Sequence, residues 1–281
     1  RLNSKINKRS NVLYIILLFV QFIISRVLIF ILRASVDIRD LSGLGQHLDV
    51  FKLLNYNLSE ILLNLNSQPP LWNIILSILL RISGGKLHSF TNLYLLFSFF
   101  ISFLICLLVY TISLSITRNK LLALLASSIY ISLSSSYFYE LLIFYPLLTA
   151  FLLTLMIGSI LFMHKEENEA FVILWATLSI ISSFLLGLTW SLFHPLIIVI
   201  FSIYVLSLLF RKLRLIFPAT LSVKSLFLVL SLLLLVLNLA WPIKNYILFN
   251  EFSSSTWLGM NLAQVSPNNL YDECNMYAKP S

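Results

Sequence analysis

The chain has 281 residues, of which 59% are hydrophobic and 11% are charged, and its mean hydropathy is +0.94. A soluble domain is about half apolar and about a quarter charged, so this composition excludes a soluble globular protein, a disordered chain and a disulfide scaffold. The apolar runs are continuous rather than alternating, which argues against a transmembrane β-barrel. A multi-pass helical membrane protein remains.

Seven stretches are long enough to cross a bilayer, whose core of about 30 Å needs about 20 residues of helix. The uncharged stretch 170–210 is too long for one crossing, and we divide it where His194 and Pro195 interrupt it. The expected spans are 12–32, 91–117, 121–137, 141–163, 170–190, 195–210 and 222–243. They predict an all-α transmembrane bundle that forms a single domain over residues 1–281.

One apolar stretch, Pro70–Ser83, is short for a crossing, and the distribution of charge places it. If it stays at the outer interface and the N-terminus is cytoplasmic, every short cytoplasmic loop is basic, as the positive-inside rule requires. The basic residues on that side are then Arg1, Lys5, Lys8, Arg9, Arg118, Lys120, Lys165, Arg211, Lys212, Arg214 and Lys224. The formal charge of +8 thus reflects topology, and we expect no nucleic-acid partner. A bacterial inner membrane and an endoplasmic reticulum membrane are both open.

This topology places a long loop at 33–90 and a tail at 244–281 on the outer side. Apolar residues recur at helical spacing within the loop, at Leu48, Phe51, Leu54, Leu58, Ile61, Leu62 and Leu65. The spacing predicts short amphipathic helices that lie at the membrane surface.

Ionisable residues near the hydrocarbon are costly unless paired, and they therefore mark candidate sites. Arg26 lies in the first span, one to two turns from its outer end, and we expect it to snorkel to the outer interface. Glu140 follows the third span at the outer mouth, among aromatic residues that include Tyr145. A solvated turn carboxylate and a site carboxylate both fit that position.

Three more polar residues lie at the outer ends of later spans. For His194 a structural hydrogen-bonding role and a catalytic one are both open. Lys244, followed by Asn245, either anchors the helix at the interface or holds an anion such as a phosphate. The outer face thus collects carboxylates and a cation, a combination typical of a transferase: Asp49, His47, Gln68, Glu140, His194, Lys244 and Asn245.

Motifs of soluble enzymes do not compete with this interpretation. The chain contains no Walker loop, no dinucleotide-binding glycine pattern and no metal-binding HExxH or CxxC motif. The cofactor is therefore unknown: a divalent metal is open, although no motif indicates one. Asn57-Leu58-Ser59 fits a glycosylation sequon on the outer side.

Three stretches of the sequence form motifs that composition alone does not explain. They are Gln46–Asp49 with Ser67-Gln68-Pro69-Pro70-Leu71-Trp72-Asn73, then Ser191-Leu192-Phe193-His194, and then Trp241-Pro242-Ile243-Lys244-Asn245-Tyr246 continuing to Leu262. In this order they resemble the membrane glycosyltransferases of the C-type superfamily. The likeness is to the bacterial family that includes lipid A aminoarabinose transferases and relatives of protein O-mannosyltransferases.

The resemblance implies a polyprenyl-phosphate-linked sugar as donor and a transfer to a lipid, glycan or protein acceptor on the outer or lumenal face. Asp49 would be the catalytic base, with Asp40 as its rival, and Glu140 would be the second acidic site. Lys244 would stabilise the leaving polyprenyl phosphate. The residues expected to bind substrate are Asp40, His47, Gln68, Tyr145, His194, Lys244, Asn245, Trp257 and Asn261.

The chain departs from the family pattern in several places. Its first loop lacks the usual Asp-Glu pair, and Glu140 stands where Asp is usual. Lys244 stands where Arg is usual, which keeps the charge but loses the bidentate geometry toward phosphate. Family members continue with further spans, so we expect more sequence beyond Ser281.

Two other functions remain. A lipid or solute transporter would need polar groups and helix breaks near mid-membrane, whereas Gly and Pro lie mostly near the span ends here. A non-catalytic subunit of a glycosylation complex would explain the missing Asp-Glu pair.

Overall fold

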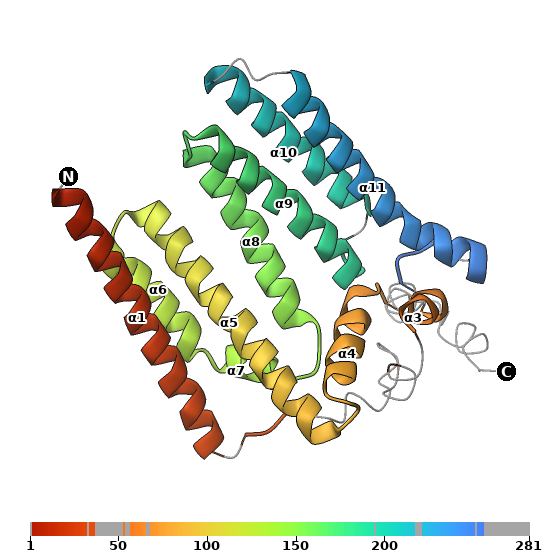
Figure 1. The fold of residues 1–281 in the computed structure, drawn as a ribbon, viewed down its shortest axis with the longest axis horizontal. Coiled ribbons are helices and arrows are strands. Elements are labelled where there is room, and N and C mark those ends of the chain that lie inside the picture. The colour runs from red at the N-terminus through yellow and green to blue at the C-terminus, as the bar shows by residue number, and fades with distance from the viewer. Residues whose placement is uncertain are drawn as a thin grey trace, which may run out of the picture.

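The computed structural model describes residues 2–32, 34–36, 53, 57–65, 68–193, 195–216, 221–250 and 252–255. These residues form a helical bundle in which α1 and α11 lie at opposite edges, with α5, α8 and α9 between them (Figure 1). The helices are α1 (Leu2–Ile31), α3 (Leu58–Asn64), α4 (Leu71–Ile82), α5 (Leu87–Thr117), α6 (Lys120–Ser132), α7 (Ser134–Leu141), α8 (Pro146–Lys165), α9 (Glu169–Thr189), α10 (Pro195–Ile216) and α11 (Leu221–Phe249).

Six of the described helices are long and apolar enough to cross a membrane: α1, α5, α8, α9, α10 and α11. The bent pair α6 and α7 makes a seventh if the two count as one span. Large apolar side chains, such as Phe100 and Ile200, are exposed on the outside of the bundle. Such a surface suits contact with lipid. The protein is therefore an all-α, multi-pass integral membrane protein, as composition predicts.

The structure corrects the third predicted span, 121–137, which is broken rather than continuous. Helices α6 and α7 meet at Leu133 with a bend of 52°. The backbone of Leu133 is extended, and its carbonyl accepts a hydrogen bond of 2.7 Å from the Ser136 hydroxyl. Serine hydroxyls that bond nearby backbone compete with helical hydrogen bonds, so the serine-rich run 132–136 is where the helix breaks.

Two further boundaries differ from prediction. Helix α8 begins at Pro146 instead of residue 141, with the proline at a position where its missing N–H costs no helical hydrogen bond. Helix α11 runs through Pro242 to Phe249 instead of ending at residue 243. Figure 1 shows its last turns bending away from its first part, as expected where a proline removes a donor. Lys244 and Asn245 therefore lie in a helix and not in an outer tail.

Part of the first loop docks on the bundle as helix α4. This helix is too short to cross a membrane, and it packs against α5 and α9. One face buries Trp72, Leu76 and Leu80 in a core shared with α5, α8 and α9. The Trp72 ring meets the ring of Tyr94 edge-on, with centroids 6.4 Å apart. The short helix predicted near Leu58–Leu65 is confirmed as α3.

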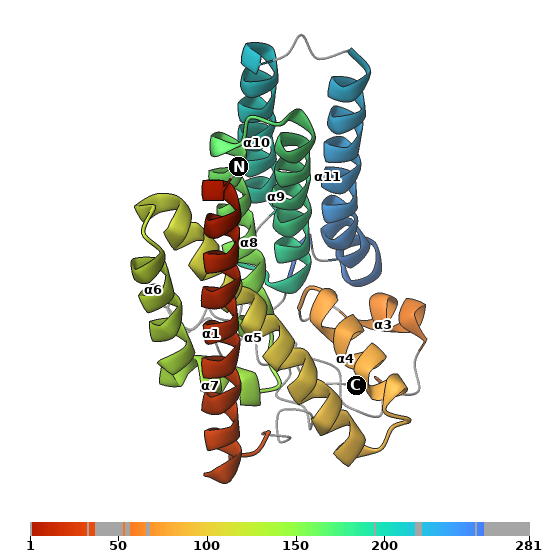
Figure 2. The same cartoon turned by 60° about the vertical axis from the view of Figure 1, so that its left-hand side comes forward.

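The connections gather at two ends of the bundle (Figure 2). The α4 end holds α3, α4 and α7, the last turns of α1, α9 and α11, and the first turns of α5, α8 and α10. The opposite end, here called the basic end, holds the turns at 118–119 and 166–168. There Lys165 Nζ donates to Ser115 O, and Lys212 Nζ donates to His164 O at 2.5 Å, a placement that suits cations at helix C-termini. The grouping of loops agrees with the predicted topology, and its orientation in the membrane stays a prediction.

Candidate functional site

A buried ion pair joins α1 to α7. Arg26 and Glu140 are 2% and 0% exposed. Arg26 Nε donates to Glu140 Oε2 at 3.0 Å, and Arg26 Nη2 donates to Oε1, so the pair is bidentate. Charge-assisted bonds in this geometry offset part of the cost of removing both charges from water.

The guanidinium of Arg26 has further partners within the bundle. Nη1 donates to the carbonyl of Ile131 on α6 at 3.2 Å, and Nη2 donates to the hydroxyl of Ser102 on α5 at 3.3 Å. The Phe22 and Tyr137 rings lie 4.0 Å and 4.8 Å from its central carbon, within range of a cation–π interaction. One arginine thereby links four helices.

The predicted snorkelling of Arg26 is wrong, because the side chain turns inward to a carboxylate, a carbonyl and a hydroxyl. Glu140 is not a solvated turn carboxylate either, since it lies in α7 and is fully buried. Both of its oxygens accept from Arg26, which gives it a structural role in the bundle. Its assignment as a catalytic residue stays a prediction.

Lys244 lies in very different surroundings, near the end of α11. Its Nζ donates to the carbonyl of Leu65 at 2.5 Å and stands 4.0 Å and 5.0 Å from the centroids of the Trp241 and Phe249 rings. In the part of the chain that the structure describes, no carboxylate lies within ion-pair distance of this ammonium. A half-buried cation that faces a carbonyl and two rings has room for an anionic partner.

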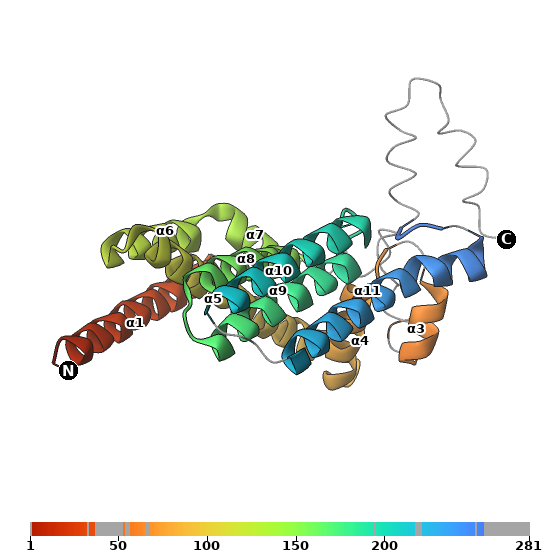
Figure 3. The same ribbon diagram turned by 90° about the horizontal axis from the view of Figure 1, so that it is seen from above.

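An apolar groove of about 400 Å³ runs beside Lys244. It lies between α3 and the last turns of α11, which Figure 3 shows side by side. Among the described residues of its lining, Lys244 is charged and the others are aliphatic: Leu63, Val236, Ala240, Ile243, Ile247 and Leu248. The described part of the groove thus combines an apolar wall with a positive charge.

Two side chains of α11 hold the segment 252–255, here called the strap. Trp241 Nε1 donates to Ser254 O at 3.0 Å, and Asn245 Nδ2 donates to Ser253 O at 2.8 Å. Trp241 and Asn245 are 7% and 1% exposed, so both bonds lie inside the protein. The predicted substrate-binding residue Asn245 therefore positions backbone through its amide nitrogen, while its Oδ1 has no partner among the described residues.

Two other predicted site residues are buried near the α4 end. Gln68 precedes α4, and its Oε1 has no hydrogen-bond partner within the described ranges. Tyr145 precedes α8, and its ring centroid lies 5.9 Å from that of Trp190, which in turn lies 5.9 Å from that of Phe193. Burial raises the pKa of the Tyr145 phenol above its ordinary value.

Six predicted site residues lie outside the described residues: Asp40, His47, Asp49, His194, Trp257 and Asn261. Among the predicted site residues that are described, Glu140 lies apart from Lys244. Lys244 meets the carbonyl of Leu65, so the first-loop region and the last span come together although 179 residues separate them. Glu140 lies on α7 near the α1 edge, whereas Lys244 lies on α11 at the opposite edge (Figure 1). The structure therefore does not bring this carboxylate and this cation into one site.

Several residues that matter in the structure carry no signal in the sequence. Ser102 is one of many serines in apolar runs, yet it bonds Arg26 and lies 3.1 Å from the Tyr130 hydroxyl. Ser254 is another, buried in the strap, where its carbonyl accepts the hydrogen bond from Trp241. The pairing of Arg26 with Glu140 has a weak signal in the sequence, because both are ionisable residues within or next to apolar spans.

Among the described residues no group of three His, Cys, Asp or Glu side chains could hold a metal ion. Comparisons of the chain with protein-family profiles, with curated proteins and with solved structures give no match. The resemblance to C-type glycosyltransferases therefore stays a prediction from the motifs. The structure itself shows an all-α bundle of membrane-spanning helices.

Proposed function

We propose that the protein is a membrane glycosyltransferase that moves a sugar from a polyprenyl-phosphate-linked donor to an acceptor at the α4 end. The observation that carries the proposal is the position of Lys244, a cation without a carboxylate partner among the described residues, in an otherwise aliphatic groove. Two residues of the motif Trp241-Pro242-Ile243-Lys244-Asn245 of the family resemblance, Ile243 and Lys244, line this groove.

The two halves of such a donor match the two properties of the groove. A polyprenyl chain is apolar and suits the leucine and isoleucine lining. A phosphate is an anion, and it would offset the cost of desolvating the ammonium of Lys244. A soluble nucleotide sugar would use only the charge, because its base and ribose are polar.

The chemistry is a displacement at the anomeric carbon of the donor. A bond forms from the acceptor oxygen to this carbon while the bond from the carbon to the phosphate oxygen breaks. Asp49 takes the proton of the acceptor hydroxyl, and Lys244 stabilises the negative charge that grows on the leaving phosphate. The assignment of Asp49 comes from the resemblance alone.

Lipid binding is the direct test. The purified protein is placed in nanodiscs, and its affinities for polyprenyl phosphate and for polyprenol of the same chain length are measured by native mass spectrometry. Lys244→Met should weaken binding of the phosphate by about 10- to 100-fold, the value of one charge-assisted bond, and leave polyprenol binding unchanged. Lys244→Arg should keep the affinity for the phosphate.

Lys86 provides a matched control, because it is an exposed lysine at the same end of the bundle. Lys86→Met should bind polyprenyl phosphate as the unaltered protein does. Equal affinity of the unaltered protein and of Lys244→Met for the phosphate would contradict the proposal.

A second function, that of a non-catalytic lipid-binding subunit, is favoured by the pairing of Glu140 with Arg26. That pairing takes the one acid that the resemblance places after the third span away from the groove. Proteoliposomes supplied with a panel of polyprenyl-phosphate sugars separate the two functions. Transfer that is lost in Asp49→Asn supports the enzyme, whereas binding through Lys244 without any transfer supports the subunit.

A further inference from the structure

The ammonium of Lys244 contacts two aromatic rings, and neither ring is among the described residues that line the groove. Its Nζ lies 4.0 Å from the centroid of the Trp241 ring and 5.0 Å from that of the Phe249 ring. An anion that enters through the groove therefore need not displace either ring.

The contacts of this ammonium leave it able to bind an anion. A lysine ammonium carries three N–H donors, and among the described residues the carbonyl of Leu65 accepts from one of them. An aromatic face attracts a cation and, unlike a carboxylate, carries no net charge that would repel an anion. The rings thus hold the ammonium of Lys244 without neutralising it, whereas Glu140 neutralises Arg26.

Trp241 is the better placed of the two rings. It is 7% exposed, whereas Phe249 is 36% exposed. Its Nε1 donates to the carbonyl of Ser254 at 3.0 Å, so the strap fixes the indole. Helix α11 places Trp241 three residues before Lys244, and side chains at this spacing lie on the same face of a helix. Tryptophan is also the aromatic residue that attracts a cation most strongly.

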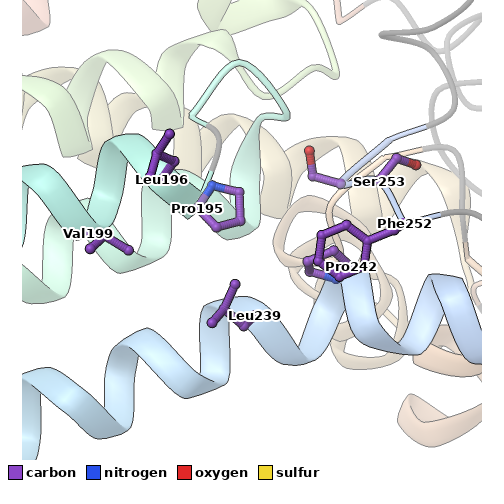
Figure 4. Close-up of a pocket in the computed structure, with 8 residues that line it drawn as sticks. Pro195, Leu196, Val199, Leu239, Pro242, Phe252 and Ser253 are labelled. Atoms are coloured by element: carbon purple, nitrogen blue, oxygen red, sulfur yellow. The ribbon is translucent and has the colours of Figure 1, made fainter.

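The strap is held by a second hydrogen bond from α11. Asn245 Nδ2 donates to the carbonyl of Ser253 at 2.8 Å. Figure 4 shows Phe252 and Ser253 of the strap beside Pro242, the residue that follows Trp241. Because the backbone that accepts the indole bond is itself tied to α11, the ring of Trp241 has little freedom to turn.

We propose that Trp241 is a positioning residue of the phosphate site, which acts through Lys244 by holding its ammonium beside the groove before the polyprenyl phosphate binds. A lysine side chain has several rotatable bonds, and ordering it only on binding would weaken the affinity by about 3- to 10-fold. This inference rests on the proposed function, because it concerns the cation of the same site.

Affinities for polyprenyl phosphate and for polyprenol, measured in nanodiscs by native mass spectrometry, test this role. Trp241→Leu removes the ring and keeps an apolar side chain. It should weaken binding of the phosphate by about 3- to 10-fold and leave binding of polyprenol unchanged. Trp241→Phe keeps a ring face and loses the bond to the strap, so it should weaken binding of the phosphate by only about twofold.

A double-mutant cycle shows whether Trp241 acts through Lys244. In the Lys244→Met background, Trp241→Leu should cause no further loss of affinity for the phosphate, because the ammonium that the ring positions is gone. A ring that merely supported the helix or the strap would weaken binding of both lipids, and it would do so in either background. Tyr204→Leu, which removes an exposed ring from α10, is the control and should leave both affinities unchanged.

The outcomes separate this inference from the proposed function. If Lys244→Met weakens binding of the phosphate and Trp241→Leu does not, the phosphate site stands and the positioning role is overturned. Equal losses from Trp241→Leu with and without Lys244 would overturn that role as well. If Lys244→Met has no effect, the phosphate site fails and its positioning residue fails with it.

Circular dichroism checks that Trp241→Leu is folded. If it is not, the cycle is run with Trp241→Phe, which should lose about twofold in affinity for the phosphate when Lys244 is present and nothing when it is absent. The same loss in both backgrounds, or no loss in either, would contradict the inference.

Discussion

Arg26 and Lys244 are both cations of apolar helices, and the structure surrounds them in opposite ways. Arg26 is 2% exposed and is bound by a carboxylate, a carbonyl and a hydroxyl from three other helices. Lys244 is half-buried and meets one carbonyl and two aromatic rings. A charge in a membrane protein is costly, so its partners indicate whether it serves the fold or a ligand.

The two edges of the bundle therefore differ in what their charges contact. At the α1 edge the charges of Arg26 and Glu140 face each other in a bidentate pair that links α1 and α7. The α11 edge keeps a charge beside a groove of about 400 Å³. Five variants test this division, from the largest expected change in unfolding free energy to the smallest.

The largest effect is expected from Arg26→Met. This change leaves the Glu140 carboxylate buried without its partner, which should lower the free energy of unfolding by about 3–5 kcal/mol. Unfolding of the detergent-solubilised protein in sodium dodecyl sulfate, followed by circular dichroism, measures it. A loss below about 1 kcal/mol would mean that the pair does not stabilise the bundle.

The double variant Arg26→Met with Glu140→Leu sharpens that result. Because both charges are removed together, it should be more stable than the sum of the two single changes by about 1–3 kcal/mol. Additive losses in the same unfolding assay would contradict a direct interaction between the two side chains.

A smaller effect is expected from Ser102→Ala. The change removes one hydrogen bond from Arg26 and one contact with Tyr130, so the free energy of unfolding should fall by about 1–3 kcal/mol. Ser113→Ala on the same helix is the control, since Ser113 is not buried. Equal stability of both variants would separate Ser102 from the ion-pair network.

Trp241→Phe tests the strap at the other edge. It deletes the bond from Nε1 to Ser254 O and keeps most of the ring, so the cost should be about 1 kcal/mol. Proteolysis and hydrogen exchange should report faster opening near residues 252–255, with little change at α1. Unchanged exchange of the strap would show that the indole bond does not hold it.

The smallest effect on stability is expected from Lys244→Met. The change loses a hydrogen bond and two ring contacts, yet it also removes the cost of desolvating the ammonium, so the net change should be less than about 1 kcal/mol. Binding of polyprenyl phosphate should fall at the same time. A loss of stability as large as that of Arg26→Met would instead assign Lys244 to the fold.

Most of the architecture could be predicted from the sequence, because a bilayer requires long apolar helices. Each such helix is one continuous run of apolar residues, which can be read directly along the chain. The break at Leu133 and the passage of α11 through Pro242 could not, because serine and proline occur both inside membrane helices and at their breaks, so packing decides between the two. The short helix α3 followed from apolar spacing, whereas the docking of α4 depends on side chains of α5 and α9.

The candidate site divides in the same way. Composition by itself determined that the chain is a membrane protein. The positions of Arg26, Glu140 and Lys244 in the sequence also showed that each charge is costly to remove from water and needs a partner. Only the tertiary structure decided which partner each of these side chains contacts. Arg26 and Glu140 are 114 residues apart, and their pairing depends on how α1 and α7 pack. Lys244 lies beside a groove with the carbonyl of Leu65, the residue that follows α3, as its hydrogen-bond acceptor, and no carboxylate of the described residues is within ion-pair distance.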